Sequence, residues 1–573
     1  MKKNISIKYN DKNEFIITNA NGLDYDYFPL TNGYTLKSSI NHNFNGDMKL
    51  DQNHFILSPV SELDLKNSLL GRNVYLNVND EVYNLNGSSP LDKLNDDEVT
   101  VKGGFLYYEI ERKHRLFKTN TLTYSPFNND NVEVSRLTIT NTSNETIKIK
   151  SILSIPLYSR SADSIRDHRH VTSLLNKIEV LKDGIINTPT MLFDEKSHLK
   201  GDSIYGVFTK SKVDIKQYFP TIDSLTLEGS ELSYPSAIVN NVKSNINVGD
   251  VVTGLEALGG FEFKTFYLVP NNSIDIYFVI LHSENNEDVL SLKDKYLNNF
   301  DFYLNENKEN WKTKLSVLEF KYKDNNLNNW LKWVSLQPIL RRIFGCSFLP
   351  HHDYGKGGRG WRDLWQDLLS LLYMEPKEVE DLLFNNFIGV RLDGSNATII
   401  GDKKGEFKAD RNAITRVWSD HGAWPYLTLE RYINISGNKD FLLKEQVYFK
   451  DKFTHYTKKV DEEIIGSSFA LDEENKVYYG TILEHLIIQN LVAFYNVGNH
   501  GFLKLENADW NDGLDMASDK GESIAFTSLY GSNLVSLGNM IKSLDVKYLY
   551  ILKELNVLLK NDDLSIENKK KIF

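Results

Sequence analysis

The sequence predicts a multidomain protein with β structure in its first half and α structure in its second half. Up to residue 284, short segments alternate apolar and polar residues, which is the period of half-buried strands. From residue 325 onward, apolar residues recur at helical spacing in long segments joined by short polar loops. A chain of 573 residues is also too long for one ordinary domain. We therefore expect a β-sandwich domain, a helical linker and a helical domain.

The strand pattern is clearest in "VEVSRLTITNTSNETIKIKSILSI" (132–155), where two alternating segments flank a cluster of Asn, Thr and Ser. This arrangement predicts a β-hairpin. Further strands are expected in "NEFIITN", "SIYGVFTKS", "FEFKTFYLVP" and "SIDIYFVIL". Short strands at regular intervals predict an antiparallel β-sandwich over residues 1–284.

Helical periodicity begins with a segment that we interpret as a linker over residues 285–324. Residues 325–573 form the predicted helical domain, and no strand pattern recurs there, so we expect it to be all-α. Several of its helices are apolar nearly all round, as in the inner ring of a helical barrel. The helices are expected at 327–344, 363–374, 377–390, 424–436, 440–452 and 481–497.

Composition excludes several classes of function. The net charge of -11 disfavours binding to nucleic acids and to anionic membranes. Cys346 is the only cysteine, so no disulfide framework or cysteine-based metal site is expected. The N-terminus has no apolar signal region, and no run of about 20 apolar residues could cross a bilayer. These features favour a cytoplasmic enzyme.

The segment "HHDYGKGGRGWRDLWQD" (351–367) is a first candidate site. Its "GKGGRG" matches a dinucleotide-binding pattern but lacks the preceding strand, so the glycines more simply allow a turn or close backbone approach. Asp363 and Asp367 are four residues apart and share one helical face, where their charges repel. Arg362 could hold sugar hydroxyls beside Trp361 as a stacking plane. The alternative is a helix N-terminus whose acids favour the helix dipole.

The segment "RVWSDHGAWP" (416–425) is a second candidate. Asp420 precedes a helix that Pro425 is suited to begin, so it is either a ligand-binding residue or a residue of the cap region. No H-x-x-x-H or H-E-x-x-H spacing accompanies the histidines, and no metal site is predicted.

The acidic stretch "ENADWNDGLDMASDKGES" (506–523) is the third candidate. It fails the EF-hand template, because Gly513 and Lys520 occupy positions that need oxygen ligands. A solvated loop remains possible, but Trp510 lies between two acids. An indole that partly desolvates a carboxyl raises its pKa, which is useful for the acid of a glycosidase.

Four blocks in order resemble glycoside hydrolase family 94, which comprises inverting disaccharide phosphorylases. "GWRDLWQDLLSLLYMEP" is similar to the R-D-x-x-Q-D helix of the family, and "VWSDHGAWPYLTLERYINISGNKDFL" to its D-D-H-x-W segment. "GTILEHLIIQNLVAF" precedes "ADWNDGLD", which looks like the D-W-N-D-G loop. "YFPLTNGYTLKSSINHNFNGDMKLDQNHFILSPVS" also looks like the N-terminal region of the family. The resemblance implies an N-terminal β-sandwich, a helical linker and an (α/α)6 barrel.

The resemblance also implies residue roles. Asp512 matches the general acid, and Trp510 would line the same site. Arg362 and Asp363 would hold the glucosyl residue at the donor subsite. The remaining substrate-binding candidates are Arg359, Asp420 and Asp367. Ser419 and Trp365 depart from the family pattern, which weakens the alignment around Asp420 and could alter the subsite.

The implied reaction is the reversible, inverting phosphorolysis of a β-linked glucose disaccharide or oligosaccharide to α-glucose 1-phosphate. Phosphate is the co-substrate and no cofactor is expected. A phosphorylase can dispense with the base of an inverting hydrolase, because phosphate is already an anionic nucleophile. Two alternatives remain open. One is a hydrolase or β-glucan transglycosylase on the same scaffold, and the other is a non-catalytic carbohydrate-binding protein.

An (α/α)6 barrel has twelve helices, but only about six to eight can be counted here from periodicity. We therefore expect a barrel that is incomplete at the C-terminus, with phosphate-pocket residues beyond residue 573. The expectation is that this chain alone is inactive. A homodimer and a complementary C-terminal half are both open as partners.

Overall fold

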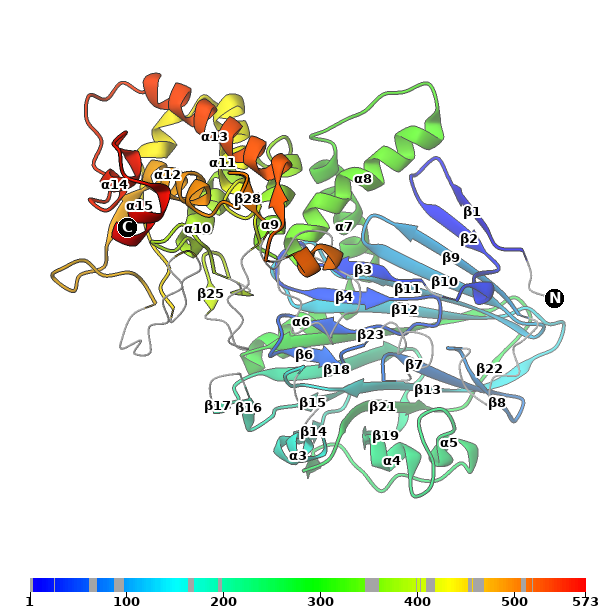
Figure 1. Cartoon of the computed structure of the whole chain (residues 1–573). Coiled ribbons are helices and arrows are strands. Elements are labelled where there is room, and N and C mark those ends of the chain that lie inside the picture. Colours follow the sequence, from blue (N-terminus) through cyan, green and yellow to red (C-terminus); the bar gives the residue numbers. More distant parts are fainter. Residues whose placement is uncertain are drawn as a thin grey trace. The chain divides into compact units, whose positions relative to one another are not determined.

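The computed structural model of the chain forms two compact units, Met1–Gly357 (unit 1) and Gly358–Phe573 (unit 2). The described residues are 4–24, 26–60, 70–86, 97–162, 169–193, 198–345, 360–397, 399–401, 403–408, 418–451, 456, 468–505, 512–517 and 519–573. Only the backbone is described for residues 169, 170, 193, 198, 199, 399, 408, 512, 513 and 515. Figure 1 shows unit 1 as mainly strands and unit 2 as mainly helices, which is the predicted order.

Unit 1 is built on an antiparallel sheet of 11 strands, centred on long strands whose side chains alternate between two buried faces. Across the sheet the strands are β1 (Ser6–Tyr9), β2 (Phe15–Thr18), β9 (Glu98–Gly104), β10 (Tyr107–Lys113), β11 (Phe117–Tyr124), β12 (Val132–Asn141), β23 (Ser273–Ser283), β18 (Ile204–Ser211), β15 (Gly184–Asn187), β14 (Lys177–Val180) and β20 (Val251–Thr253).

Two further antiparallel sheets pack against this one. Ile139 and Phe278 of the large sheet share a single buried cluster with Leu76, Leu153 and Met48 of the other two sheets. The result is the predicted β-sandwich, stabilised mainly by burial of these apolar side chains. The six-stranded sheet contains β19 (Ile215–Thr221), β21 (Ala257–Phe263), β13 (Ile147–Leu157), β7 (Asn73–Val78), β8 (Glu81–Asn84) and β22 (Phe266–Leu268). The four-stranded sheet contains β3 (Phe28–Thr31), β4 (Lys37–Ile40), β5 (Met48–Lys49) and β6 (Phe55–Leu57).

The hairpin predicted over residues 132–155 is wrong, although both strands are present. β12 pairs with β11 and β23, whereas β13 pairs with β7, β21 and β22 in the other sheet. The connection therefore crosses between the layers. Asn141 fixes this crossing, because its Nδ2 donates to the carbonyls of Glu145 at 2.7 Å and Leu268 at 2.8 Å. Alternation identifies strands but does not identify their pairing partners.

Helices cover the outer faces of the sandwich. α6 (Asn286–Asn298) and α7 (Phe300–Leu315) pack against the large sheet, and α4 (Ile222–Thr226) and α5 (Ser236–Val239) pack against the six-stranded sheet. α6 and α7 fall in the segment where helical periodicity was expected. The smaller elements of unit 1 are η1 (Ala20–Gly22), α3 (Arg169–Thr172), η2 (Ser173–Leu175), β16 (Met191–Phe193) and β17 (His198–Lys200).

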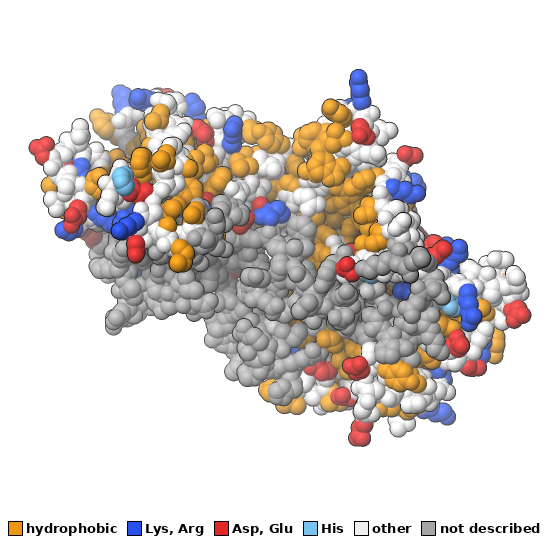
Figure 2. Space-filling model, turned by 45° about the vertical axis from the view of Figure 1, so that its right-hand side comes forward, with side chains coloured by type: hydrophobic (Ala, Val, Ile, Leu, Met, Phe, Trp, Pro, Cys, Tyr) orange, Lys and Arg blue, Asp and Glu red, His pale blue; other side chains and the backbone are white. Residues whose placement is uncertain are grey.

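The long helix α8 (Asn325–Phe344) also belongs to unit 1. Asp324 caps its N-terminus, because the carboxylate accepts from the amide of Asn326 at 2.8 Å. Trp333 attaches the helix to the sheet, since its Nε1 donates to the carbonyl of Asn13 at 3.0 Å. The other side of α8 leaves Trp330 about half exposed. Figure 2 shows hydrophobic side chains gathered in several places on the face of the molecule that it draws.

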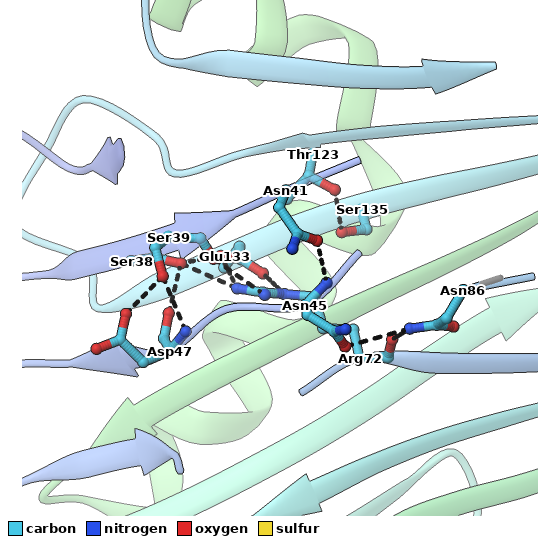
Figure 3. A network of polar contacts seen from close by, with 10 residues as sticks. All are labelled: Ser38, Ser39, Asn41, Asn45, Asp47, Arg72, Asn86, Thr123, Glu133 and Ser135. Carbon is cyan, nitrogen blue, oxygen red and sulfur yellow. Dashed lines mark hydrogen bonds and ion pairs between the residues drawn. The ribbon is translucent and has the colours of Figure 1, made fainter. Parts of the chain in front are cut away.

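A buried ion pair links the three sheets of the sandwich in unit 1 (Figure 3). Arg72, which precedes β7, donates from Nε at 2.5 Å and Nη2 at 2.6 Å to the two carboxylate oxygens of Glu133 on β12. Ser38 on β4 donates to Glu133 at 2.5 Å, and Arg72 Nη1 reaches the carbonyl of Ser39 at 3.2 Å. Both charged side chains are fully buried. The pair therefore depends on this complete set of partners.

Unit 2 is mainly helical, and α11 shows why its helices form where the sequence predicts. Pro425 lies in its first turn, and Gly437 ends it with φ 72°, a left-handed conformation that favours glycine. The helices are α9 (Trp361–Leu371), α10 (Pro376–Asn386), α11 (Trp424–Ser436), α12 (Ile482–Val492), α13 (Ile524–Lys542), α14 (Leu555–Leu559) and α15 (Ile566–Ile572). The 3-10 helices are η3 (Phe387–Gly389), η4 (Lys439–Leu443), η5 (Ala493–Tyr495) and η6 (Asp512–Ala517).

The expectation of an all-α second half is wrong, because unit 2 also contains three short two-stranded sheets. The helix predicted over residues 440–452 ends as η4, and the chain continues as a strand. That strand pairs with residues far along the sequence, which periodicity within one segment does not reveal. The pairs are β24 (Ile399–Ile400) with β25 (Phe407–Lys408), β26 (Glu445–Val447) with β27 (Tyr479–Thr481), and β28 (Leu503–Lys504) with β29 (Glu522–Ser523). In the described part of the chain, no helix combines the length and apolar character needed to cross a bilayer.

Candidate active site

Arg362 and Asp420 form a buried ion pair in unit 2. The guanidinium donates from Nε to Oδ2 at 2.5 Å and from Nη2 to Oδ1 at 2.7 Å. The two side chains are 5% and 3% exposed. Two parallel hydrogen bonds fix the orientation of both planar groups, so the pair locks the first turn of α9 onto a segment 58 residues later.

Asp420 lies in the turn of residues 418–423, which we call the Asp420 turn. Burial alone would raise the pKa of this carboxyl. The hydrogen bond from Arg362, the charge of His421 and the hydrogen bond from Trp424 Nε1 at 2.8 Å outweigh burial and hold the pKa below its ordinary value. The Trp418 ring lies 4.6 Å from the guanidinium of Arg362. Asp420 is thus an ionised anchor at neutral pH and is unsuited to donate a proton.

Helices α12 and α13 hold the Asp420 turn from two sides. Asn533 Nδ2 on α13 donates to the carbonyl of Ala423 at 3.1 Å. A Cβ placed on Gly422 would lie 2.9 Å from the Tyr530 hydroxyl and 3.0 Å from the carbonyl oxygen of Gln489. Only glycine permits this close approach without a shift of a helix.

Trp361 does not provide the sugar-stacking plane suggested by the sequence. The side chain is 2% exposed, and its Nε1 donates to the carbonyl of His421 at 3.0 Å. Its ring packs against Trp365 at 5.6 Å. Trp365 in turn packs against Phe387 at 4.9 Å and is fully buried. Both indoles therefore contribute to the interior of unit 2.

A two-stranded sheet brings together the two ends of the acidic stretch that contains Asp512. Leu503 pairs with Ser523 and Lys504 with Glu522, so the residues between β28 and β29 form one loop. Leu503 is also bound to α13, because its amide donates to Thr527 Oγ1 at 2.9 Å. Asp512 is the first residue of η6 within this loop, and its side chain lies outside the described residues.

Glu522 binds the turn that leads into this loop. Its carboxylate accepts from the amide of His500 at 3.2 Å, from His500 Nδ1 at 2.9 Å and from the amide of Phe502 at 3.0 Å. The His500 hydrogen bond is the main cause that lowers the pKa of Glu522. The sequence interpretation assigned Glu522 no role, whereas the structure shows it as a support of the loop that carries Asp512.

The remaining predicted residues fall into two groups. Asp363 is half-buried in the first turn of α9, and Asp367 is buried one turn later. Arg359 and Trp510 lie outside the described residues. Among the described residues, no group of three or more His, Cys, Asp or Glu side chains is arranged to hold a metal ion.

Sequence reasoning missed a buried carboxyl on α12. Glu484 accepts hydrogen bonds from the Tyr448 hydroxyl at 2.7 Å, from the Tyr478 hydroxyl at 3.1 Å and from the amide of Leu552 at 2.6 Å. Burial raises its pKa, although these hydrogen bonds oppose the shift. The sequence signal that could have identified Glu484 was an acid followed by His485 inside a mainly apolar helix. The arrangement is structural, because it joins α12 to three separate segments.

Residues 51–299 match the family description "Glycosyl hydrolase 94, supersandwich domain", and residues 310–548 match "Glycosyl hydrolase 94 superfamily, catalytic domain". The chain belongs to glycoside hydrolase family 94. The ion pair, the Asp420 turn and the loop of Asp512 all lie in the residues that match the family 94 catalytic domain. The family 94 assignment confirms the predicted fold class of a β-sandwich followed by an (α/α)6-type helical domain.

One solved structure shares the fold of this family 94 chain, and a second aligns with it more weakly. A human-microbiome protein described as a kojibiose phosphorylase aligns with 99% of the chain and 70% of its own length, at 9% identity and a TM-score of 0.51. A bacterial glucoamylase complexed with acarbose aligns with 91% of the chain and 68% of its own length, at 9% identity and a TM-score of 0.45.

Among curated proteins, the cyclic β-(1,2)-glucan synthase NdvB of Rhizobium meliloti is 24% identical over 199 residues. The match covers 34% of this family 94 chain but only 6% of the synthase. Together the comparisons support a carbohydrate-active enzyme.

Proposed function

We propose that unit 2 catalyses the reversible, inverting phosphorolysis of a β-linked glucose disaccharide or oligosaccharide. The products are α-glucose 1-phosphate and a sugar shortened by one glucose. The observation that carries this proposal is the buried Arg362–Asp420 pair, which places a rigid polar turn in the family 94 catalytic domain. Phosphate is the co-substrate, no cofactor takes part, and the cytoplasm is the proposed compartment.

In this proposal Asp512 is the general acid. It protonates the glycosidic oxygen as the bond from that oxygen to C1 breaks, while a phosphate oxygen forms a new bond to C1 from the opposite face. In the reverse direction the Asp512 carboxylate takes the proton of the acceptor hydroxyl. Because Asp420 is held ionised by Arg362, it is unsuited to this role. Trp510 would lie beside the acid.

The donor subsite is assigned to the first turns of α9 and to the Asp420 turn. Arg362 orients Asp420, and Asp363 and Asp367 are the acids of α9 proposed to accept hydrogen bonds from glucosyl hydroxyls. Arg359 is the cation proposed to extend this subsite. Neutral hydroxyls suit ionised carboxylates as partners, because charge-assisted hydrogen bonds are stronger than neutral ones.

The similarity to a cyclic β-(1,2)-glucan synthase favours a second candidate. On the same scaffold a β-glucan transglycosylase would transfer the glucosyl residue to a sugar hydroxyl, and a hydrolase would transfer it to water. Neither reaction needs phosphate, so phosphate dependence separates both from the proposed function.

The test supplies cellobiose, laminaribiose or sophorose with and without phosphate and measures α-glucose 1-phosphate. The assay uses the 573-residue chain. The proposal expects α-glucose 1-phosphate only with phosphate, and none with Asp512→Asn. Release of glucose that is independent of phosphate contradicts it. Sugar binding without turnover in every sample would identify a carbohydrate-binding protein instead.

A further inference from the structure

Gln489 on α12 is a buried amide without a partner. The residue is 0% exposed, and neither its Oε1 nor its Nε2 has a hydrogen-bond partner among the described residues. A buried amide that loses its hydrogen bonds to water and gains none destabilises the folded state. Such a group in the interior of a catalytic domain indicates that a bound molecule supplies the missing hydrogen bonds.

The neighbouring residue on α12 shows the ordinary arrangement. Asn490 is equally buried, but its Nδ2 donates to the carbonyl of Leu486 at 2.9 Å and its Oδ1 accepts from Asn533 at 2.9 Å. The Asn490 amide is thus bound to the protein, whereas the Gln489 amide has no hydrogen-bond partner among the described residues. The contrast singles out Gln489 within a single turn of helix.

The backbone of α12 approaches the Asp420 turn at Gln489. Its own carbonyl oxygen is the atom that approaches Gly422. One turn later on the same helical face, Ala493 packs with Ala423 and with Leu503, the residue from which the acidic loop departs. Gln489 therefore belongs to a segment that contacts both the Asp420 turn and the base of the loop that carries Asp512.

A second buried donor lies nearby. The Nε1 of Trp365 on α9 is fully buried and has no hydrogen-bond partner among the described residues. Phe387 packs against Trp365 at 4.9 Å and against His485 on α12 at 5.9 Å, so it connects the two helices. An indole only donates, whereas an amide both donates and accepts.

We propose that the Gln489 amide forms a hydrogen bond with a hydroxyl of the bound glucosyl residue. A hydroxyl donates and accepts, and so matches both ends of the neutral amide, whereas a phosphate anion is matched better by a cationic side chain. Gln489 is then a specificity-determining residue of the donor subsite. This inference rests on the proposed function, because that function places a glucosyl residue in unit 2.

The test replaces Gln489 with Leu and titrates the wild-type chain and the variant with glucose and with its 2-, 3-, 4- and 6-deoxy analogues. In the wild type we expect one deoxyglucose to bind roughly tenfold more weakly than glucose, the loss of one good hydrogen bond. In Gln489→Leu that sugar and glucose should bind equally. The melting temperature of Gln489→Leu should equal or exceed that of the wild type, because no protein hydrogen bond is lost.

Asn490→Leu is the matched control and should lower the melting temperature, since it breaks two hydrogen bonds. If the pattern of deoxyglucose binding is the same in the wild type and Gln489→Leu, the amide holds only internal water and the inference is overturned. These titrations need no turnover. Phosphate-independent activity would therefore contradict the proposed phosphorolysis and leave the role of Gln489 standing.

Discussion

Arg362 donates two parallel hydrogen bonds, of 2.5 Å and 2.7 Å, to the Asp420 carboxylate in the interior of unit 2. The pair joins a helix N-terminus to a turn that α13 also holds through Asn533. Three segments distant in the sequence thus meet at the Asp420 turn. These contacts fix the geometry of the turn, and a site fixed in advance loses less entropy when a ligand binds.

We expect Asp420→Asn to destabilise unit 2 by about 3 to 5 kcal/mol, because it removes the buried negative charge that binds Arg362 through two hydrogen bonds. Urea denaturation measures this loss. The double variant Arg362→Met with Asp420→Leu removes both charges and should recover much of the stability. Equal stability of Asp420→Asn and the wild type would show that the pair is open to solvent.

Glu133→Gln should destabilise unit 1 by a similar amount, about 3 to 5 kcal/mol, since the Arg72 cation would remain buried. Thermal unfolding followed by circular dichroism is the measurement. Glu111→Gln is the control, because its ion pair with Lys118 is more than one third exposed and should contribute little. A loss confined to Glu111→Gln would contradict the network in Figure 3.

Glu522→Ala should loosen the turn that leads into the Asp512 loop. Without the carboxylate, the amides of His500 and Phe502 lose their acceptor. Hydrogen–deuterium exchange of peptides that cover these two amides should therefore become about tenfold faster or more. Exchange in α11 should stay unchanged. Unaltered exchange at the turn would show that the hairpin of β28 and β29 suffices to hold the loop.

The stability of unit 1 should fall on acidification because of His282. Burial lowers the pKa of His282 from its ordinary 6.5 to about 4, and the nearby charge of His54 adds to this effect. The unfolded state therefore binds a proton more readily, so stability is full above about pH 6.5 and decreases as the pH falls toward 4. The contribution reaches about 3 kcal/mol at pH 4.

His282→Phe keeps a ring beside Tyr205, which lies 5.1 Å from the His282 ring, and removes the titration. Its unfolding free energy should decline less than that of the wild type between pH 6.5 and 4. The difference between the two proteins isolates His282 from the neighbouring pair of His54 and Asp51, which titrates in both. Parallel pH profiles would contradict the low pKa.

Sequence periodicity predicted the individual helices and strands well and their tertiary pairing poorly. Residues 424–436 form a helix over the predicted range, because a proline begins it and a glycine ends it. The strands β12 and β13 also form, but they belong to different sheets. The alternation of apolar and polar residues within one segment indicates which side chains are buried. The pairing of strands depends instead on contacts with residues one hundred or more positions away.

The candidate site shows the same limit. The sequence singled out Arg362 and Asp420 separately, and nothing in it indicated that they bind each other. Gln489 was missed because a polar residue in an apolar helix has no recognisable motif. Its importance follows only from the absence of a partner among the described residues. Glu522 was also assigned no role, because its hydrogen bonds to the backbone amides of His500 and Phe502 depend on the geometry of the loop.

The proposed function requires that the first turns of α9 and the Asp420 turn bind a glucosyl residue. Calorimetric titration with glucose of the wild-type chain, Asp363→Asn and the exposed control Asp563→Asn tests it most directly. We expect saturable binding by the wild type and the control, with affinity roughly tenfold lower in Asp363→Asn. Absence of glucose binding by the wild type, or equal binding by all three proteins, would contradict it.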